Sequence, residues 1–240
     1  MFKNMLKKIL YGHRSSQEAY VAYLKKCGVK VGKHIEIFTP KETVIETLNP
    51  HLLEIGNCVS MTGPVTILNH DYSVCVLKNW SGGEILGKQR KTVIGNNVFL
   101  GFGCCVLPGT VIGDNTVIGA YAVVSGILEA DSVYAGNPAR KICSIADYYK
   151  KIKDRQLSDA CTIYEEYVKR HKQKPPMELF HEYFYLFMGG DYNNLPDAFK
   201  VKFRDHGSLD DSIVYFSKHK SMFSSYEEFC DYAERKMGEE

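Results

Sequence analysis

One stretch of this chain carries an aliphatic residue at every sixth position, and this period constrains the fold more than any other feature. The next residue is glycine in four of the six cases, which at ordinary glycine content arises by chance about 3 times in 10,000. A period of six fits neither a helix nor a simple two-residue strand pattern. It fits a β-solenoid, in which each repeat is a short flat side with a corner and successive coils stack. The six residues are Ile94, Leu100, Val106, Ile112, Ile118 and Val124.

The same six-residue period occurs earlier in the chain, from Val31 to Ile67. The later stretch begins at Ile94, 27 residues after Ile67, and 27 is not a multiple of six. Residues 71–91, which separate the two stretches, show no repeat pattern. A long insertion without regular structure in a compact domain is usually functional. We therefore expect a solenoid interrupted by one functional loop.

Small or medium residues stand two positions before the aliphatic ones, as the converging walls of a narrow prism require. Glycine, asparagine and aspartate fall at its corners, where left-handed backbone angles cost these residues least. We predict one continuous parallel solenoid over residues 28–143, with Cys104 inside it and Cys105 on its outer side.

The segments on either side of the solenoid are predicted to be helical. Residues 1–27 contain the capping-box sequence SSQE at 15–18, which is expected to open a short helix through Lys26. Beyond Pro138 the six-residue pattern stops and helix formers dominate. Residues 144–240 are therefore predicted to form a separate helical domain.

This C-terminal domain has the aromatic content to build its own core. It holds ten of the 16 tyrosines and eight of the 12 phenylalanines. Apolar residues with helical spacing from Ile145 to Val168 indicate a helix, and a second is predicted over residues 177–188. A last helix is predicted to begin at the box formed by Ser225 and Glu228.

The composition argues against several classes of protein. Lys and Arg number 30 against 28 Asp and Glu, so no global charge favours a nucleic-acid partner. The eight cysteines form no CxxC pair, so neither a zinc site nor a disulfide framework is signalled, and no metal is expected. Free cysteines suit a reducing cytoplasm. No apolar run reaches the length of a signal peptide or a membrane span.

The segment VIGNNVFLGFGCCVLPGTVIGDNTVIGA at 93–120, with AGNPAR at 135–140, resembles the hexapeptide-repeat acyltransferases. The resemblance is closer to the sugar O-acetyltransferases, which include maltose, galactoside, capsular-polysaccharide and xenobiotic enzymes. It implies a mainly β fold, a left-handed parallel β-helix, here with a short N-terminal helix and the C-terminal helical domain. It also implies a homotrimer that holds acetyl-CoA between neighbouring subunits. The expected reaction is acetyl transfer to a sugar hydroxyl in surface polysaccharide synthesis.

The family's catalytic histidine lies where the coil gives way to a protruding loop, and that position here is His70. A sugar hydroxyl is a poor nucleophile at neutral pH, and a base with the ordinary pKa of histidine can remove its proton. Asn69 is the second catalytic candidate, as a group that orients the acceptor. Asp71 and Trp80, both in the insertion, are candidate acceptor contacts. Asp71 or Glu84 is expected to hold the imidazole in one tautomer.

Cofactor contacts follow from the same resemblance. The Phe102 backbone N–H is expected to stabilise the oxyanion, and the Ala120 backbone to touch the pantetheine arm. Arg140 and Lys141 suit the phosphates of CoA by charge. Gly126 is a departure, because related enzymes often have lysine there. The full set of candidates is Gly101, Phe102, Ala120, Pro138, Arg140 and Lys141.

Three alternatives remain open at this stage. One is N-acylation of an amino-sugar nucleotide, although such enzymes often carry an extra domain before the coils and only about 27 residues precede them here. Another is a metal enzyme on the same scaffold, the γ-class carbonic anhydrase. It needs three converging histidines, including a close pair, and the coils offer His34, His51 and His70 without such a pair. The third is a scaffold without activity. The acceptor itself has no recognisable motif.

Overall fold

The computed structural model describes residues 2–204 and 208–238. The chain divides into two compact units, residues 1–148 and 149–240. The boundary between these units falls within one long helix, α4 (Ile145–His171). The three-part division at 27/28 and 143/144 stays a prediction.

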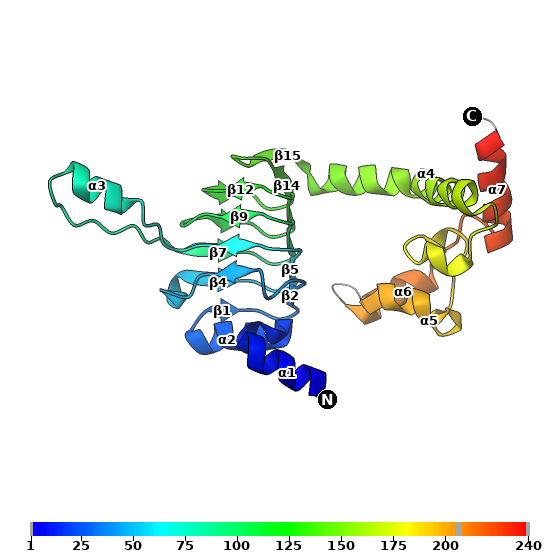
Figure 1. Cartoon of the computed structure of the whole chain (residues 1–240). Coiled ribbons are helices and arrows are strands. Elements are labelled where there is room, and N and C mark those ends of the chain that lie inside the picture. The colour runs from blue at the N-terminus through cyan, green and yellow to red at the C-terminus, as the bar shows by residue number, and fades with distance from the viewer. Residues whose placement is uncertain (1, 205–207, 239–240) are drawn as a thin grey trace. The chain divides into compact units, whose positions relative to one another are not determined.

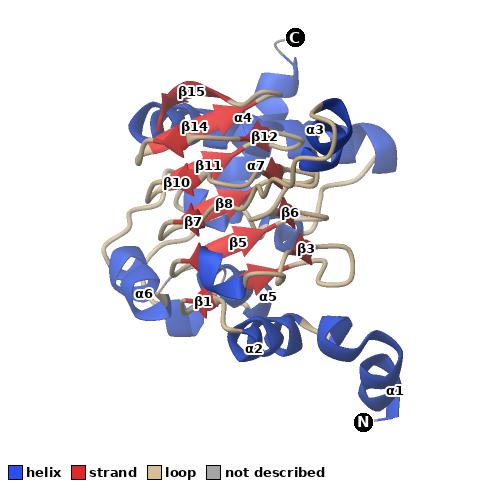
Figure 2. Ribbon diagram, turned by 90° about the vertical axis from the view of Figure 1, so that its left-hand side faces the viewer, coloured by secondary structure: helices blue, strands red, loops and turns tan. Residues whose placement is uncertain are grey.

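The first unit is a solenoid built from three sheets of short strands (Figures 1 and 2). Within each sheet the strands of successive coils are parallel, and only β15 is antiparallel to its neighbour β14. The first sheet contains β1 (Lys30–Val31), β4 (Leu53–Ile55), β7 (Thr92–Ile94), β10 (Val111–Ile112) and β13 (Ile127–Leu128). The second contains β2 (Glu36–Ile37), β5 (Val59–Met61), β8 (Val98–Leu100), β11 (Thr116–Ile118), β14 (Ser132–Ala135) and β15 (Arg140–Ser144). The third contains β3 (Val44–Ile45), β6 (Thr66–Ile67), β9 (Cys105–Val106) and β12 (Val123–Val124).

The coils run without a break across the insertion. Ile67 of β6 pairs in parallel register with Val106 of β9, and Ile55 of β4 pairs with Ile94 of β7. The chain therefore leaves the solenoid after Ile67 and re-enters it one coil further on. The predicted continuous parallel solenoid is confirmed.

The aliphatic residues that define the six-residue period point into the core. All six aliphatic residues of the periodic stretch are at most 1% exposed. The smaller residues two positions earlier are buried as well, and their hydroxyls are satisfied locally, as when Thr116 Oγ1 donates to the Gly113 carbonyl at 2.8 Å. Cys104 is buried and Cys105 is half-buried on the outer side, as predicted.

The glycine after each aliphatic residue is explained by the close stacking of the coils. A Cβ on Gly101 would lie 2.7 Å from the Ala120 nitrogen and 2.7 Å from the Ile118 oxygen of the next coil. At the corners, Asn97 and Asn115 both adopt φ of 53° and form a ladder, with Asn97 Nδ2 donating to Asn115 Oδ1 at 2.9 Å. Left-handed geometry and side-chain pairing together favour asparagine at this corner.

The different environments of the thiols predict an order of alkylation in the native protein. Cys75 is exposed, whereas burial raises the pKa of the Cys104 thiol to about 12. Since the thiolate is the reactive form, Cys104 is expected to react far more slowly with iodoacetamide at about pH 8 than Cys75 or Cys105. Peptide mass spectrometry during the reaction measures this order, and the denatured protein is the control. Modification of Cys104 before Cys105 would contradict the assigned phase of the repeat.

Two helices precede the first coil, α1 (Phe2–Tyr11) and α2 (Gln17–Cys27), joined by a 3₁₀ turn at Gly12–Ser15. The predicted helix is α2: the Ser16 side chain accepts from the Ala19 N–H, and Gly28 ends the helix with φ of 103°. Its Tyr20 and Leu24 are buried in the solenoid core, so α2 closes that end of the prism. Helix α1 is an addition to the single helix expected from the sequence.

The insertion is more ordered than its lack of pattern indicated. It contains a short helix, α3 (Val74–Trp80), and projects from the solenoid in Figure 1. At its base His70 and Gln89 form an antiparallel bridge. The expectation of a structureless loop was wrong, because the pairing at the base brings the two ends together. We call residues 71–91 the arm.

The second unit is helical and has its own aromatic core. All eight phenylalanines beyond residue 148 are buried in this core. Helix α4 and the last helix, α7 (Tyr226–Gly238), are as predicted, with Ser225 Oγ accepting from the Glu228 N–H at 3.1 Å. The remaining helices are α5 (Asp197–Lys200), α6 (Leu209–Ser217) and 3₁₀ turns at Met177–Phe180, Phe184–Leu186, Tyr192–Asn194 and Val201–Arg204.

The helix predicted over residues 177–188 was wrong, since this segment forms two separate 3₁₀ turns, Met177–Phe180 and Phe184–Leu186. Its aromatic side chains pack in different directions within one core. Phe184 stacks on Phe199 at 5.0 Å between ring centroids, while Phe180 meets Phe229 edge-on at 5.2 Å. Tertiary packing of the rings overrides the local helical preference.

Candidate active site

His70 lies at the junction between β6 and the arm. Its side chain is only 10% exposed, and its Nδ1 is 3.5 Å from Oε1 of Glu46. This distance fits an ion pair, but the geometry does not form a hydrogen bond, and Nδ1 has no hydrogen-bond partner among residues 2–204 and 208–238. The edge of the Tyr72 ring meets the imidazole at 3.9 Å between centroids. The ring of His70 is therefore held between a carboxylate of the solenoid and an aromatic residue of the arm.

Glu46 is the carboxylate beside His70, and no pattern in the sequence marks it. It follows Ile45 of β3, which pairs with Ile67 of β6, so stacking of the first two coils brings Glu46 next to the His70 turn. Glu46 Oε2 accepts a hydrogen bond from the Asn69 N–H at 2.7 Å. The Glu46 side chain is 17% exposed, and one carboxylate thus contacts both candidate residues.

Asn69 is fully buried under this carboxylate. Its Nδ2 donates to the Asn49 carbonyl at 2.8 Å, which ties the turn to the preceding coil. Its Oδ1 is buried and has no hydrogen-bond partner in the described part of the chain. Buried polar groups normally form hydrogen bonds within the protein. Among the described residues Asn69 Oδ1 and His70 Nδ1 do not, so folding alone does not account for these two polar atoms at this turn.

Backbone hydrogen bonds close the base of the arm over this turn. The Asp71 N–H donates to the Lys88 carbonyl at 3.0 Å, and the Arg90 N–H donates to the Asn69 carbonyl at 3.0 Å. The Lys88 ammonium pairs with Asp71 and holds the pKa of its carboxyl at about 2, so Asp71 stays charged at neutral pH. Glu84 is exposed on the arm. The carboxylate that faces the imidazole is that of Glu46, and the suggested Asp71 or Glu84 does not occupy this place.

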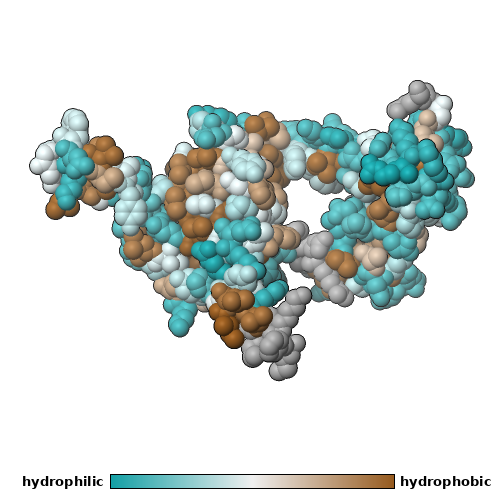
Figure 3. Space-filling view, in the orientation of Figure 1, coloured by the Kyte–Doolittle hydropathy of each residue, from teal (hydrophilic) through white to brown (hydrophobic). Residues whose placement is uncertain are grey.

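The arm presents apolar side chains to solvent. Trp80, at the end of α3, is 85% exposed, and Ile85 is 86% exposed. Tyr72 and Val76 are exposed as well, and Figure 3 shows apolar atoms on the arm. Large exposed apolar side chains on one projecting element are typical of an interaction surface.

Three of the candidate cofactor residues lie together on two stacked coils. Gly101 packs directly under Ala120, and the Phe102 carbonyl accepts from the Tyr121 N–H at 2.7 Å. The Phe102 side chain is 46% exposed and meets Tyr121 edge-on at 5.5 Å. Across residues 2–204 and 208–238, no hydrogen bond uses the Phe102 N–H, so this donor is available to a ligand.

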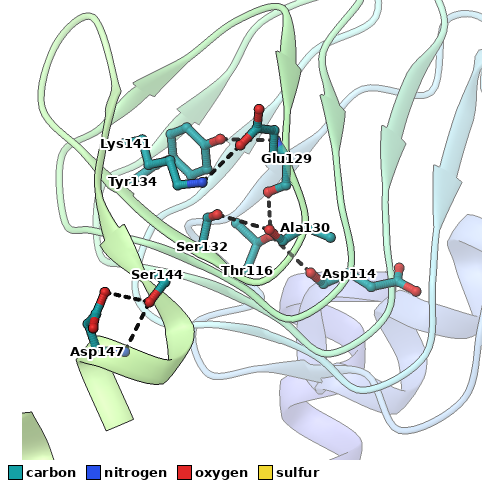
Figure 4. A network of polar contacts seen from close by, with 9 residues as sticks. All are labelled: Asp114, Thr116, Glu129, Ala130, Ser132, Tyr134, Lys141, Ser144 and Asp147. Atoms are coloured by element: carbon teal, nitrogen blue, oxygen red, sulfur yellow. Dashed lines mark hydrogen bonds and ion pairs between the residues drawn. The ribbon is translucent and has the colours of Figure 1, made fainter. Parts of the chain in front are cut away.

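The other three candidates, Pro138, Arg140 and Lys141, are exposed at the last coil. The Ala139 N–H donates to the Val123 carbonyl, which fixes this segment to the coil before it. Lys141 Nζ forms an ion pair with Glu129 at 2.8 Å, shown in Figure 4. Arg140 contacts only its neighbour, with Nη1 donating to the Ala139 carbonyl at 3.0 Å. Of the two cations, Arg140 is the one without an acidic partner among the described residues.

Two other kinds of site are absent from the described part of the chain. No three His, Cys, Asp or Glu side chains in this part lie close enough to hold a metal ion. No helix in it combines the length and apolar character that crossing a membrane requires. The second unit contains a cavity of about 700 Å³ with walls from α4 and α6, and none of the candidate residues above lines it.

Comparisons with known proteins find relatives of this chain. The family model described as bacterial transferase hexapeptide (six repeats) matches residues 91–126. Protein CapG of Staphylococcus aureus is 37% identical over 129 residues, which cover 54% of this chain and 73% of CapG. The lipopolysaccharide biosynthesis O-acetyl transferase WbbJ of Escherichia coli, described as putative, is 50% identical over 55 residues, 23% of this chain and 28% of WbbJ. A solved galactoside acetyltransferase in complex with coenzyme A is 27% identical, with a TM-score of 0.42, and the match covers 62% of this chain and 83% of that one.

The stacked parallel coils and these matches define a class of protein, and the chain belongs to the hexapeptide-repeat transferase family. Within that family it is an enzyme of the acyltransferase type.

Proposed function

We propose that this protein is an acetyl-CoA-dependent O-acetyltransferase that acetylates a sugar hydroxyl in surface polysaccharide synthesis. The observation that carries the proposal is the buried His70 with the Glu46 carboxylate at its Nδ1. The names of related proteins, lipopolysaccharide O-acetyl transferase and galactoside O-acetyltransferase, support a sugar acceptor. A coenzyme A complex of a galactoside acetyltransferase gives the cofactor class.

In the proposed mechanism Glu46 fixes the tautomer of His70. With the Nδ1 proton directed at the carboxylate, Nε2 is the free base that accepts the proton of the acceptor hydroxyl. The 3.5 Å separation is long, as is common before substrate binds. The hydroxyl oxygen forms the new bond to the thioester carbonyl carbon, and the carbon–sulfur bond then breaks. The leaving thiolate takes the proton back from His70, and the Phe102 N–H stabilises the oxyanion formed in between.

We assign the remaining candidates to binding. Gly101 allows the close approach of the coils under Ala120. The Ala120 backbone is assigned to the pantetheine arm, and Pro138 is assigned to CoA binding as well. Arg140 binds a CoA phosphate directly, whereas Lys141 does so by exchanging its partner Glu129 for phosphate.

Asn69 positions Glu46 through its N–H, and Asp71 and Trp80 hold the acceptor from the arm. We also propose that the protein is a homotrimer, that its solenoid is left-handed and that it is located in the cytoplasm. The eight free thiols support a reducing compartment.

The test is consumption of acetyl-CoA against a panel of sugars and polysaccharide precursors, with the product identified by mass spectrometry. Treatment of the product with mild alkali separates the alternatives, because an O-acetyl ester is cleaved and an N-acetyl amide is not. An alkali-stable product would favour the amino-sugar alternative. No acetyl transfer with any acceptor would contradict the proposal.

If neighbouring subunits share one active site, two different inactive variants should regain activity when they are mixed. A flat solenoid wall gives CoA no deep groove, so two neighbouring copies must form one. His70→Ala and Arg140→Ala chains are each expected to be inactive or weak, and mixed trimers of the two to recover activity. The assay is turnover after the two variants are unfolded and refolded together, with each variant refolded alone as control. Absence of recovery in mixed trimers that sedimentation shows to have formed would place both residues in one subunit.

A further inference from the structure

The positive charge of this chain is concentrated at one end. Residues 1–35 contain eight Lys or Arg and a single acidic residue, Glu18. Residues 36–240 contain 22 Lys or Arg and 27 Asp or Glu, so the rest of the chain is net acidic. A charge asymmetry of this size is typical of a segment that contacts an anionic partner.

Helix α1 lies within this basic segment and its sequence is amphipathic. In LKKILY, the part of α1 whose side chains are described, the apolar residues Leu6, Ile9 and Leu10 fall within an arc of about 100° on a helix. Lys7 and Lys8 lie outside this arc. A short helix with one apolar face and a lysine-rich polar face is characteristic of helices that lie in a lipid–water interface.

The apolar residues of α1 whose side chains are described are exposed. Leu6 is 47% exposed, Ile9 71% and Leu10 65%. Figure 3 shows this face as an apolar patch beside the N-terminal end of the first unit. Three exposed large aliphatic residues on one helix are costly in water, since each exposes apolar surface that burial would stabilise.

The turn after α1 anchors the helix to the end of the solenoid. The Lys41 ammonium lies 3.6 Å from the centre of the Tyr11 ring, and Arg14 Nη1 donates to the Lys41 carbonyl at 3.1 Å. The His13 ring stacks on Tyr23 of α2 at 3.8 Å. These contacts involve Tyr11 at the end of α1, the turn and α2, and among the described residues none of them uses Leu6, Ile9 or Leu10.

We propose that α1 binds an anionic lipid surface, with Leu6, Ile9 and Leu10 inserted among the acyl chains and the lysines at the headgroups. Both charge and shape select this partner. Each lysine near an anionic bilayer adds attraction, and the exposed Lys25 and Lys26 of α2 extend the basic region. A second copy of α1 is a poor partner, because its own lysines would repel. The enzyme would lie on the membrane without spanning it, and this inference does not depend on the acceptor.

The test is sedimentation of the full-length protein with vesicles of phosphatidylcholine, alone or mixed with phosphatidylglycerol. Binding is expected to the anionic vesicles at low salt and to weaken as salt screens the lysines. The variant Lys7→Gln/Lys8→Gln is expected to lose affinity by about 25-fold, at about fivefold for each lysine. The variant Ile9→Lys adds charge but removes an inserted side chain, and it is expected to bind at least about fivefold more weakly.

Val214→Lys is the matched control, because Val214 is an exposed aliphatic residue of α6, 55% exposed. Its vesicle binding is expected to equal that of the wild type. Tighter binding of Ile9→Lys would show adsorption by charge alone and overturn the insertion. Equal binding to neutral vesicles, or none to anionic ones, would overturn the proposal outright. A change in the oligomeric state of Ile9→Lys without lipid would assign the apolar face to contacts between copies of the chain.

Discussion

Replacing His70 with alanine is expected to lower kcat by a factor on the order of 10² to 10⁴, the usual contribution of a general base. The imidazole is the only group proposed to remove the acceptor proton, and water at that position is a far weaker base. Binding of CoA should be almost unchanged, because none of its proposed contacts involves His70. Turnover measured at saturating acetyl-CoA, together with CoA binding by calorimetry, checks both parts.

The matched control is His51→Ala, which removes an exposed histidine from the 3₁₀ turn Pro50–Leu52 of the same unit. Its kcat should equal that of the wild type. Near-normal turnover of a folded His70→Ala protein would remove His70 from the mechanism. An equal loss in the His51 variant would show that the assay reports stability and not proton transfer.

Replacing Glu46 with glutamine is expected to lower kcat by about 10- to 100-fold, with little change in KM for either substrate. The amide keeps the size of the side chain, and its oxygen can still accept from the Asn69 N–H. It loses the negative charge that stabilises the imidazolium formed when Nε2 takes the proton. A merely structural role would instead alter KM or stability, so the split between kcat and KM is the informative readout.

Glu84→Gln is the control for this prediction, because Glu84 is an exposed carboxylate on the arm and was one of the two partners suggested by the sequence. It should leave kcat unchanged. Partial recovery by Glu46→Asp relative to Glu46→Ala would support a role for the carboxylate itself. Wild-type kcat in Glu46→Gln would show that the carboxylate does not assist His70.

The location of the candidate site could be predicted from the sequence, but its composition could not. The break in the six-residue period directly after Ile67 marked the turn that contains His70. No sequence pattern pointed to Glu46, because the preceding Ile45 does not follow the six-residue period of the other inward residues. Only the pairing of Ile45 with Ile67 brings the turn that contains Glu46 beside the turn that contains His70. The short α3 was missed for a related reason: the pairing between His70 and Gln89 brings the ends of the arm together, and no local pattern encodes it.

By itself the sequence determined the solenoid, its inward residues and the position where the arm leaves it. The reason is that every coil has the same steric requirements: an aliphatic side chain inside, and glycine where the backbone of the next coil lies within van der Waals distance. The sequence pattern therefore recurs many times along the chain. The tertiary structure decided which carboxylate faces His70 and how the aromatic residues of the second unit pack. Each of these contacts is made once, between residues far apart in the chain, and its geometry exists only after the coils and the rings have stacked.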